Sequence, residues 1–567
     1  MRRFLVGLGS TLLILAAIVG VRTVTVTSRQ LSAPPAGTHR TGPVDSVAVA
    51  QHLAEAVRFR TISTNDATVT AHTELVALQQ WMQRTYPKLH ATLTREVIDG
   101  SSLLYTWKGT NPTLKPLLLM AHQDVVPVDP GTDSAWTHQP FEGTVDKGTV
   151  WGRGAFDDKS ALVGILEAME RVVASGVTPT RTVMLAFGHN EEVLGSGAAA
   201  IADTLERRGQ LPALVLDEGA AVTQKMFPGI DQPIALIGVA EKGYQTFELA
   251  AVSGGGHSSM PPRHSSVGRI ARAVVALEDH PMPAHRNGPA RELLEYLAPE
   301  MPLPSRAVFA NLWLFGPVVE RILAGKNTTD ALQRTTTAPT MLQGSAKDNV
   351  LAARATARVN FRLAPGETAE DVERHIRTVV ADDSVTITRV GVGRAPSAVS
   401  STNTPEFRVM QQAVAGAYPD ALVAPFMVMA GTDSRNYSGR VAAVFRFMPL
   451  SLTAAEIAGA HGTNERVTVA NMAHAVTFYE ALVRRYAVDA KSHCAAGATT
   501  APAARGACSG LLRLERVTLA VVPHTPCAVC RVVLKYHKPA LFVRAFEQPP
   551  LGLQRHERLH VVAHDPG

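Results

Sequence analysis

Five side chains that can hold zinc lie in five short stretches of this 567-residue chain, far apart in the sequence. Two are histidines and three are carboxylates, and a further acid, Glu191, directly precedes one of the carboxylates. Histidine and carboxylate side chains are common ligands of catalytic zinc. One carboxylate could bridge two ions while the spare glutamate acts as a base, so the set predicts a hydrolytic two-zinc site. The candidate ligands are His122, Asp157, Glu192, Asp217 and His461.

The first stretch, MAHQDVVPV, places His122 two residues before Asp124. Side chains two residues apart in a strand point to the same face. One imidazole nitrogen of His122 would bind zinc while the Asp124 carboxylate holds the other nitrogen, which fixes the tautomer. A histidine near an aspartate is also common by chance on protein surfaces, so this pair gains its weight from the other stretches.

Pairs of adjacent acids occur in two further stretches, WGRGAFDDKS and GHNEEVLGSG. Asp157 follows a glycine-rich turn and is the candidate bridge, whereas Asp158 could be only the N-cap of the next helix. Neighbouring side chains of an extended segment point in opposite directions. Glu192 would therefore bind metal while Glu191 faces the substrate as a general base. An isolated pair of this kind is more often two solvated acids.

Asp217 in LVLDEGA and His461 in AGAHGTNERV are weak signals alone, because a capping aspartate or a loop histidine explains each of them. The predicted elements strengthen both. Apolar runs predict buried strands, and helical spacing predicts a helix over Lys159–Ala174. Each candidate ligand lies at or just after the carboxyl end of a strand, where α/β sheets form their sites. The predicted strands cover 116–120, 182–187 and 213–216.

Near Ala240 the regular alternation of strands and helices gives way to strands of alternating pattern, which predicts a second domain inserted into this α/β frame. Its expected order is strand–helix–strand–strand–helix–strand, which indicates an α+β fold. Residues 280–345 within it are rich in proline, and an irregular structure is expected there. After Ser397 the α/β pattern resumes, and it closes with a helix near 468–486.

Together the stretches resemble the co-catalytic di-zinc metallopeptidases, a family that includes carboxypeptidase S, aminoacylase, glutamate carboxypeptidases and N-fatty-acyl-amino-acid synthase/hydrolase. MAHQDVVPV, WGRGAFDDK, GGGHSSMPP and HGTNERV look most similar to the carboxypeptidase S branch, and the resemblance covers roughly 46–488. It implies a zinc-peptidase-like α/β catalytic domain with an inserted ferredoxin-like lid. It also implies hydrolysis of an amide bond in a peptide or N-acyl amino acid that bears a free carboxylate.

The resemblance distributes the ligands between two zinc ions, although cobalt or manganese would fit the same side chains. Asp157 would bridge the ions. Glu191 would act as the base and then as the acid that protonates the leaving amine, and Asp124 would orient His122. The resemblance pairs His122 with Asp217 on one ion and Glu192 with His461 on the other.

Three further residues match positions with a role in the family. His257 resembles the histidine that stabilises the oxyanion of the tetrahedral intermediate. Arg435, in AGTDSRNY, resembles the arginine that grips a substrate carboxylate in two places. Asn349, in DNVLAA, resembles a substrate-contact position. In dimeric members the histidine is supplied across the subunit interface, so a homodimer through the lid is compatible with the sequence.

The N-terminus reads MRRF and continues as an apolar run over Phe4–Val21. This run is at the lower limit for spanning a bilayer and long for a signal peptide. An uncleaved signal-anchor is the preferred interpretation, and a cleaved signal peptide is the alternative. Both predict an exported protein, either anchored in a membrane or secreted or periplasmic.

The net charge of +6 first suggests an acidic partner, but the excess lies in one segment. Residues 490–567 carry ten Lys and Arg against four Asp and Glu, so the preceding body is neutral and no nucleic-acid partner is predicted. All four cysteines lie there too. Cys527 and Cys530 lack a second pair with zinc-site spacing, because Cys494 and Cys508 are too far apart. This tail does not resemble the family and is expected to be poorly ordered.

Two alternatives to a hydrolase can be considered from the sequence. An exported, non-catalytic binding protein with a vestigial site is the alternative function, but relics usually lose a ligand or the base, and every such position is intact here. Synthesis of N-acyl amino acids would use the same site in reverse, and the sequence does not separate it from hydrolysis.

These patterns divide the chain into six stretches of sequence. The expected parts are 1–21 (anchor or signal), 22–45 (linker), 46–238 and 396–488 (catalytic domain), 239–395 (lid) and 489–567 (tail).

Overall fold

The computed structural model describes residues 2–31, 42–65, 71–225, 227, 229–285, 287–489, 531–534 and 541–544. Nearly all of the predicted tail, with its four cysteines, lies outside the described residues. The two tail segments that are described form an antiparallel pair, β18 (Arg531–Leu534) and β19 (Leu541–Arg544).

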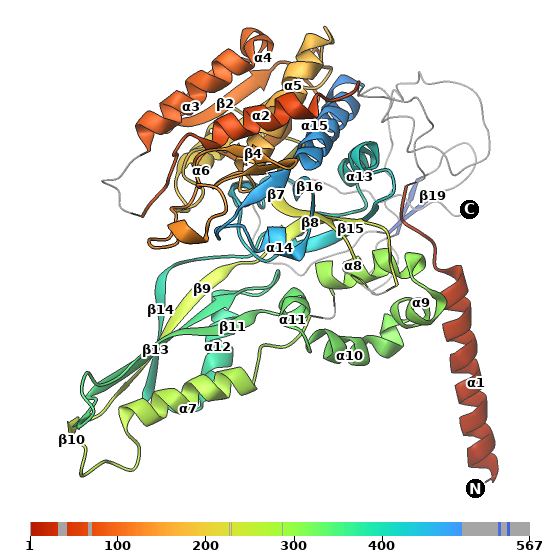
Figure 1. Ribbon diagram of the computed structural model, residues 1–567. Helices are drawn as coiled ribbons and strands as arrows, with labels where there is room; N and C mark the ends of the chain where they lie inside the picture. The colour runs from red at the N-terminus through yellow and green to blue at the C-terminus, as the bar shows by residue number, and fades with distance from the viewer. Residues whose placement is uncertain are drawn as a thin grey trace. The chain divides into compact units, whose positions relative to one another are not determined.

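An eight-stranded mixed sheet forms the centre of the chain's main part (Figure 1), in the order β1-β2-β6-β3-β7-β16-β8-β15. β3 pairs in parallel with β6 and β7, and β16 pairs in parallel with β7. Their carboxyl ends therefore meet at one edge of the sheet. The strands are β1 (Thr94–Ile98), β2 (Ser102–Trp107), β3 (Leu117–His122), β6 (Val183–Gly188), β7 (Leu214–Thr223), β8 (Ile234–Glu241), β15 (Leu422–Val428) and β16 (Ala443–Leu452).

Helices cover both faces of this sheet because its strands are apolar on both faces. In β3, Leu117 and Leu119 belong to the core beneath one helical layer, whereas Leu118 and Met120 belong to a second core. The predicted helix over Lys159–Ala174 is observed as α5, with the same ends. The first layer contains α2 (Ser46–Val57), α4 (Pro87–Thr92), α5, α13 (Pro405–Ala417) and α15 (Val469–Val483), and α6 (Gly197–Arg207) covers the second core.

A second sheet, antiparallel and four-stranded, has the order β11-β13-β9-β14. Its elements follow the chain order β9-α7-β11-β13-α12-β14, which is the expected ferredoxin-like pattern. Apolar residues of α7 and α12 share one buried cluster with the strands. The elements are β9 (Tyr244–Val252), α7 (Ser266–Asp279), β11 (Thr336–Gln343), β13 (Arg354–Arg362), α12 (Ala369–Val380) and β14 (Val385–Arg394).

The proline-rich stretch 280–345 was expected to be irregular, and that expectation is wrong. It forms four helices before entering β11. Pro289 and Pro304 lie in the first turns of their helices, where a missing N–H costs nothing. Leu293 and Leu297 pack into the core of the first sheet rather than that of the second. The helices are α8 (Pro289–Leu297), α9 (Leu303–Phe309), α10 (Leu312–Leu323) and α11 (Asn327–Gln333).

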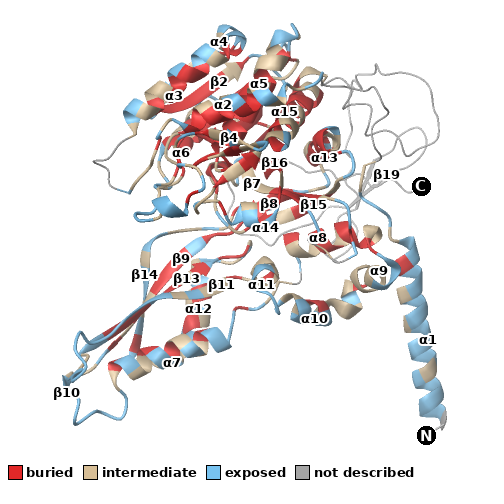
Figure 2. Cartoon of the chain, in the orientation of Figure 1, coloured by how far each residue is buried: buried red, intermediate tan, exposed pale blue. Residues whose placement is uncertain are grey.

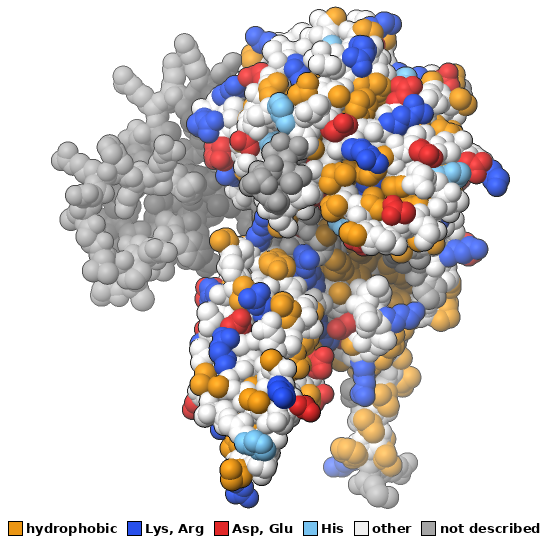
Figure 3. All heavy atoms as spheres, turned by 60° about the vertical axis from the view of Figure 1, so that its left-hand side comes forward, with side chains coloured by type: hydrophobic (Ala, Val, Ile, Leu, Met, Phe, Trp, Pro, Cys, Tyr) orange, Lys and Arg blue, Asp and Glu red, His pale blue; other side chains and the backbone are white. Residues whose placement is uncertain are grey.

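The N-terminal helix α1 (Arg2–Thr25) contains a stretch, Arg3–Thr25, that is long and apolar enough to cross a membrane. Figure 2 shows most of it exposed, and Figure 3 shows hydrophobic side chains along it. A signal sequence would have the same properties. The remaining elements are α3 (His72–Thr85), β4 (Thr144–Asp146), β5 (Thr149–Trp151), β10 (Gly256–His257), β12 (Val350–Leu351), α14 (Ala454–Ile457) and β17 (Arg466–Thr468).

Candidate metal centre

The predicted site residues come from strand ends and loops of the main sheet. His122 is the last residue of β3, and Glu191 and Glu192 lie in the loop after β6. Asp157 lies just before α5, and His461 lies in the segment between α14 and β17. Segments separated by more than three hundred residues of sequence therefore contribute to one cluster of side chains.

Asp157 stands between the two histidines. Its Oδ1 lies 3.0 Å from Nε2 of His122, and its Oδ2 lies 3.2 Å from Nε2 of His461. The same His461 nitrogen lies 3.1 Å from Oε2 of Glu192. A carboxylate whose two oxygens face two imidazoles in this way is placed to bridge two cations.

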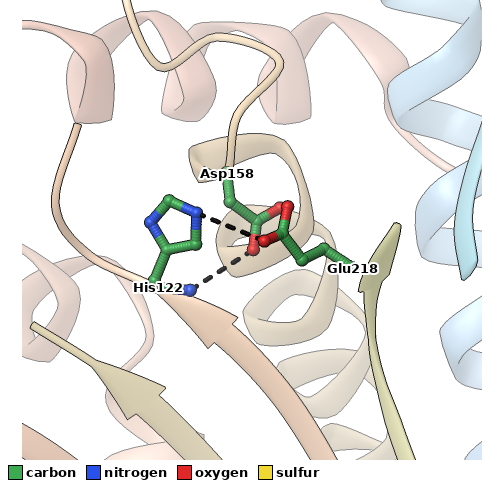
Figure 4. A group of neighbouring side chains, drawn as sticks. All are labelled: His122, Asp158 and Glu218. Carbon is green, nitrogen blue, oxygen red and sulfur yellow. Dashed lines mark hydrogen bonds and ion pairs between the residues drawn. The ribbon is translucent and has the colours of Figure 1, made fainter. Parts of the chain in front are cut away.

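Glu218, and not Asp217, faces this cluster from β7. Its Oε1 lies 3.7 Å from Nε2 of His122, and Figure 4 shows its carboxylate turned toward that imidazole. Asp217 Oδ2 instead accepts a 2.6 Å hydrogen bond from the backbone N–H of Ser434. Adjacent side chains of a strand point to opposite sides, so only one of the two acids can reach the cluster. Among the ion pairs and hydrogen bonds of the described residues, Glu218 contacts His122 whereas Asp217 contacts the loop at Ser434.

The cluster fits divalent cations by its chemistry. Oε1 of Glu192 is buried and has no hydrogen-bond partner among the described residues. Burial, with repulsion from Asp157, raises the pKa of Glu218 well above its usual range. Cations would satisfy the orphaned oxygen and offset the crowding of carboxylates. His122 belongs to two groups of side chains whose ligand atoms all lie within 4.8 Å of one another, one with Asp157 and Glu192 and the other with Asp158 and Glu218.

Asp124 is fully buried and connects the His122 side chain to the loop of acids. Nδ1 of His122 lies 3.0 Å from the backbone carbonyl oxygen of Asp124 and 3.4 Å from its Oδ1. The two carboxylate oxygens of Asp124 also accept 3.1 Å hydrogen bonds from the backbone N–H groups of Glu191 and Glu192. One carboxylate is therefore placed to orient the imidazole and to hold both acids of the loop.

Glu191 and Arg435 lie side by side at the cluster. Oε1 of Glu191 is 3.4 Å from Nη1 of Arg435, and Nη2 of Arg435 is 3.5 Å from Asp433. Burial raises the pKa of Glu191 to about 8, and the charge of Asp433 adds to the increase. A carboxyl group whose pKa lies near neutrality can both accept and return a proton. The structure thus brings together the predicted base and the predicted carboxylate-binding arginine.

Sequence reasoning missed Glu465, which organises two of the ligand loops. Its buried carboxylate accepts hydrogen bonds from the backbone N–H groups of Gly154, Phe156 and Asp157. It also accepts a 2.7 Å bond from Nη1 of Arg153, whose Nη2 donates to the carbonyl oxygen of His461. The only sequence signal was its place four residues after His461, in HGTNERV.

His257 and Asn349 lie together, but at the two-stranded antiparallel sheet formed by β10 and β12, where Asn349 directly precedes β12. The backbone N–H of Ser258 donates to the carbonyl oxygen of Asn349, and His257 Nδ1 lies 2.8 Å from the hydroxyl of Ser259. Among the described residues, no hydrogen bond or ion pair links either side chain to the metal-binding cluster. In this conformation of one chain, the structure does not bring these two predicted residues to the site.

Comparisons with known proteins agree with this geometry. Residues 118–485 match the model of peptidase family M20/M25/M40. A probable carboxypeptidase S-like protein of Dictyostelium discoideum is 38% identical over 449 residues, which cover 78% of this chain and 85% of that protein. The N-fatty-acyl-amino acid synthase/hydrolase PM20D1 of Xenopus tropicalis is 35% identical over 442 residues, covering 77% and 85%.

Solved structures share the fold at much lower identity. The M20 family metallo-carboxypeptidase of Sulfolobus solfataricus superposes with a TM-score of 0.56 at 19% identity, covering 78% of this chain and 99% of that one. The matched family segment spans more than half of the chain and contains every residue of the cluster. The chain therefore belongs to peptidase family M20/M25/M40, a family of metal-dependent hydrolases.

Proposed function

We propose that this protein hydrolyses the amide bond of a peptide or an N-acyl amino acid that bears a free C-terminal carboxylate. The observation that carries the proposal is the Asp157 carboxylate between two imidazoles, with Glu191 and Arg435 beside it. The names of the relatives, carboxypeptidase S-like protein and N-fatty-acyl-amino acid synthase/hydrolase, support these two substrate classes.

The proposed ligands differ from the sequence-based set at one position. Asp157 would bridge two ions, and Glu218 takes the place that was assigned to Asp217. Two zinc ions, or cobalt or manganese, would supply Lewis acidity that polarises the substrate carbonyl and lowers the pKa of a water molecule. One ion would be held by His122 and Glu218, and the other by Glu192 and His461.

Glu191 would move the protons of the reaction. It accepts a proton from the attacking water and later donates it to the nitrogen of the leaving amine, so that the amine departs neutral. Burial raises the pKa of this carboxyl group, which makes its charged form a stronger base toward the attacking water. Asp124 would contribute indirectly, because it positions the His122 imidazole and the backbone at Glu191.

Arg435 would select substrates that carry a carboxylate. The guanidinium can grip a carboxylate in two places, and its Nη1 is already within 3.4 Å of the proposed base. His257 would stabilise the oxyanion and Asn349 would contact the substrate, either after closure of the second domain as a lid or from the partner subunit of a homodimer. Residues 239–395 would form that lid between the two halves of the catalytic domain.

The proposed partners and location follow from the remaining features. A small peptide or N-acyl amino acid is the expected substrate, and no nucleic-acid partner is proposed. Helix α1 would attach the protein to a membrane as a signal-anchor, with the catalytic part exported. A non-catalytic binding role is disfavoured because ligands, base and arginine are all in place. Synthesis by reversal of the hydrolytic reaction would use these same residues.

A substrate panel tests the proposal. The purified full chain, with its metal content measured, is given a dipeptide, an N-acetyl amino acid, a long-chain N-acyl amino acid and the C-terminal amide of each. We expect turnover of acids and not of amides, with two metal ions per chain. The Glu191→Gln variant should keep both ions while turnover falls by about 10²–10⁴-fold. Metal-loaded enzyme that turns over no acid, or that treats acids and amides alike, would contradict the proposal.

A further inference from the structure

Helix α10 is largely apolar but lies on the surface, and Glu320 and Arg321 are its charged residues. Its sequence is LWLFGPVVERIL, and Val319 is its only residue that is buried in the described structure. Trp313, Val318 and Ile322 are 47%, 59% and 68% exposed, and Leu303 of the preceding helix α9 is 61% exposed. Val318 and Ile322 are one turn apart and share a face of the helix. Exposed apolar side chains on one face of a surface helix mark a candidate interaction site.

The junction between α9 and α10 is attached to the last turns of α1. Asn311 is fully buried, and its Nδ2 donates to the carbonyl oxygen of Val19 at 3.4 Å and to the hydroxyl of Thr23 at 3.3 Å. Thr23 is itself only 4% exposed. Figure 1 shows α9 beside the end of α1. The apolar face of α9 and α10 therefore lies next to the end of a helix that is able to span a bilayer.

Basic side chains surround this junction. A cavity of about 310 Å³ opens between the end of α1 and the helices α8 to α10. Arg22, Arg29 and Arg291 line it together with Trp313. Glu295, the acid among them, pairs with Arg291 at 2.8 Å and with Arg29 at 3.8 Å, so the lining keeps an excess of positive charge. Arginine and tryptophan beside an apolar helix are typical of segments that lie at the interface of a membrane with anionic lipids.

We propose that α9 and α10 form an interfacial membrane-binding element, inserted among the headgroups of the bilayer that α1 enters. The occupant of the apolar face is an anionic lipid bilayer, and the arginine-lined cavity takes a lipid headgroup. This membrane-binding element depends on the membrane attachment proposed above, but not on the chemistry at the metal centre. The helices of the proline-rich stretch would then hold the catalytic part against the membrane surface.

Depth-dependent quenching of a fluorescent probe tests this element in the full chain. The four tail cysteines are replaced by serine, and a single Val318→Cys variant carries an environment-sensitive label in nanodiscs of phosphatidylcholine with phosphatidylglycerol. Lipids with a quencher near the headgroup should at least halve the emission. The matched control is Val275→Cys on α7, which is also an exposed valine on a helix, at 53%, and whose emission should not change.

Two further arms separate the alternatives. A Leu13→Cys probe in α1 should respond to a quencher near the bilayer centre, which reports insertion of the anchor independently of catalysis. Emission from the Val318→Cys probe that shifts to the blue without lipid quenching would mean that a second copy covers α10, and would overturn the proposal. Equal quenching in nanodiscs of phosphatidylcholine alone would overturn the assignment of the cavity to an anionic headgroup. Loss of substrate turnover with normal quenching would count against the catalytic proposal only.

Discussion

Glu465 is the residue on which two ligand-bearing loops converge. It accepts hydrogen bonds from three backbone N–H groups of the loop that ends at Asp157, and its arginine partner holds the carbonyl oxygen of His461. A buried carboxylate with this many donors fixes geometry rather than chemistry, because no oxygen is left to reach a substrate. Residues that hold metal ligands in this way typically affect metal affinity.

The Glu465→Gln variant should lose metal more readily than the parent protein. An amide can accept only part of these hydrogen bonds, so the loops that carry Asp157 and His461 should loosen, and metal affinity should fall by about 10–100-fold. Competition with a chelator measures this directly. Glu480→Gln is the matched control, since Glu480 is equally buried and pairs with Arg171 and Arg484 away from the site. A similar loss of affinity in both variants would show that only general stability is involved.

The two adjacent acids of β7 give a second prediction at this scale. Glu218→Gln should abolish binding of one metal ion, because Glu218 faces His122. Asp217→Asn should retain both ions, because an amide oxygen can still accept the hydrogen bond from Ser434. Metal content after dialysis distinguishes the variants. Retention of both ions in Glu218→Gln, with loss in Asp217→Asn, would restore the ligand set expected from the sequence.

At the scale of elements, a buried ion pair ties β8 and β16 to the loop of the carboxylate-binding arginine. Nε of Arg446 lies 3.1 Å from Oε2 of Glu241, and both side chains are at most 3% exposed. The same Glu241 oxygen accepts hydrogen bonds from the backbone and the hydroxyl of Thr432. The carbonyl oxygen of Thr432 in turn accepts a 2.8 Å bond from Arg435. Glu241 is also the last residue of β8, directly before the second sheet begins.

Breaking this pair from one side should be costly. Glu241→Gln leaves the Arg446 charge buried without its partner and should lower the free energy of unfolding by about 3–5 kcal/mol. The Glu241→Gln/Arg446→Met double variant should recover part of the loss, because the uncompensated charge is then gone. Denaturant unfolding of the parent protein, Glu241→Gln, Arg446→Met and the double variant measures the coupling. Losses that simply add would mean that the pair does not act as a unit.

The elements also show what could be predicted from sequence and why. Helix α5 was predicted to the residue because apolar side chains repeat at helical spacing over Lys159–Ala174 and a glycine follows. The strand ends that carry His122 and Glu192 were found because buried strands are short apolar runs. The helices of 280–345 were missed because proline was taken as a helix breaker, although it suits a first turn. Glu218 was missed because choosing between adjacent acids requires the direction in which β7 faces the cluster.

At the scale of the whole molecule, the last residues of the described body are hydrogen-bonded to the segment before β6. The backbone N–H groups of Thr180 and Arg181 both donate to the carbonyl oxygen of Ala487. The Thr180 hydroxyl donates to the carbonyl oxygen of Val488, and Arg181 also bonds the carbonyl oxygen of Tyr486. The last described turn of the body is thus hydrogen-bonded to the segment that leads into β6.

Truncation after Asp489 should therefore leave the enzyme folded and active. The family match ends at residue 485, and the hydrogen bonds that fasten the final turn all come from residues before the cut. We expect an unchanged midpoint of thermal unfolding and unchanged kcat/KM on the preferred acid substrate, compared with the full chain. The measurement also separates two roles of the basic tail. A truncated protein that unfolds at the same temperature but loses turnover would show that residues 490–567 contribute to catalysis, contrary to the prediction. A lower unfolding temperature would show instead that they pack on the body.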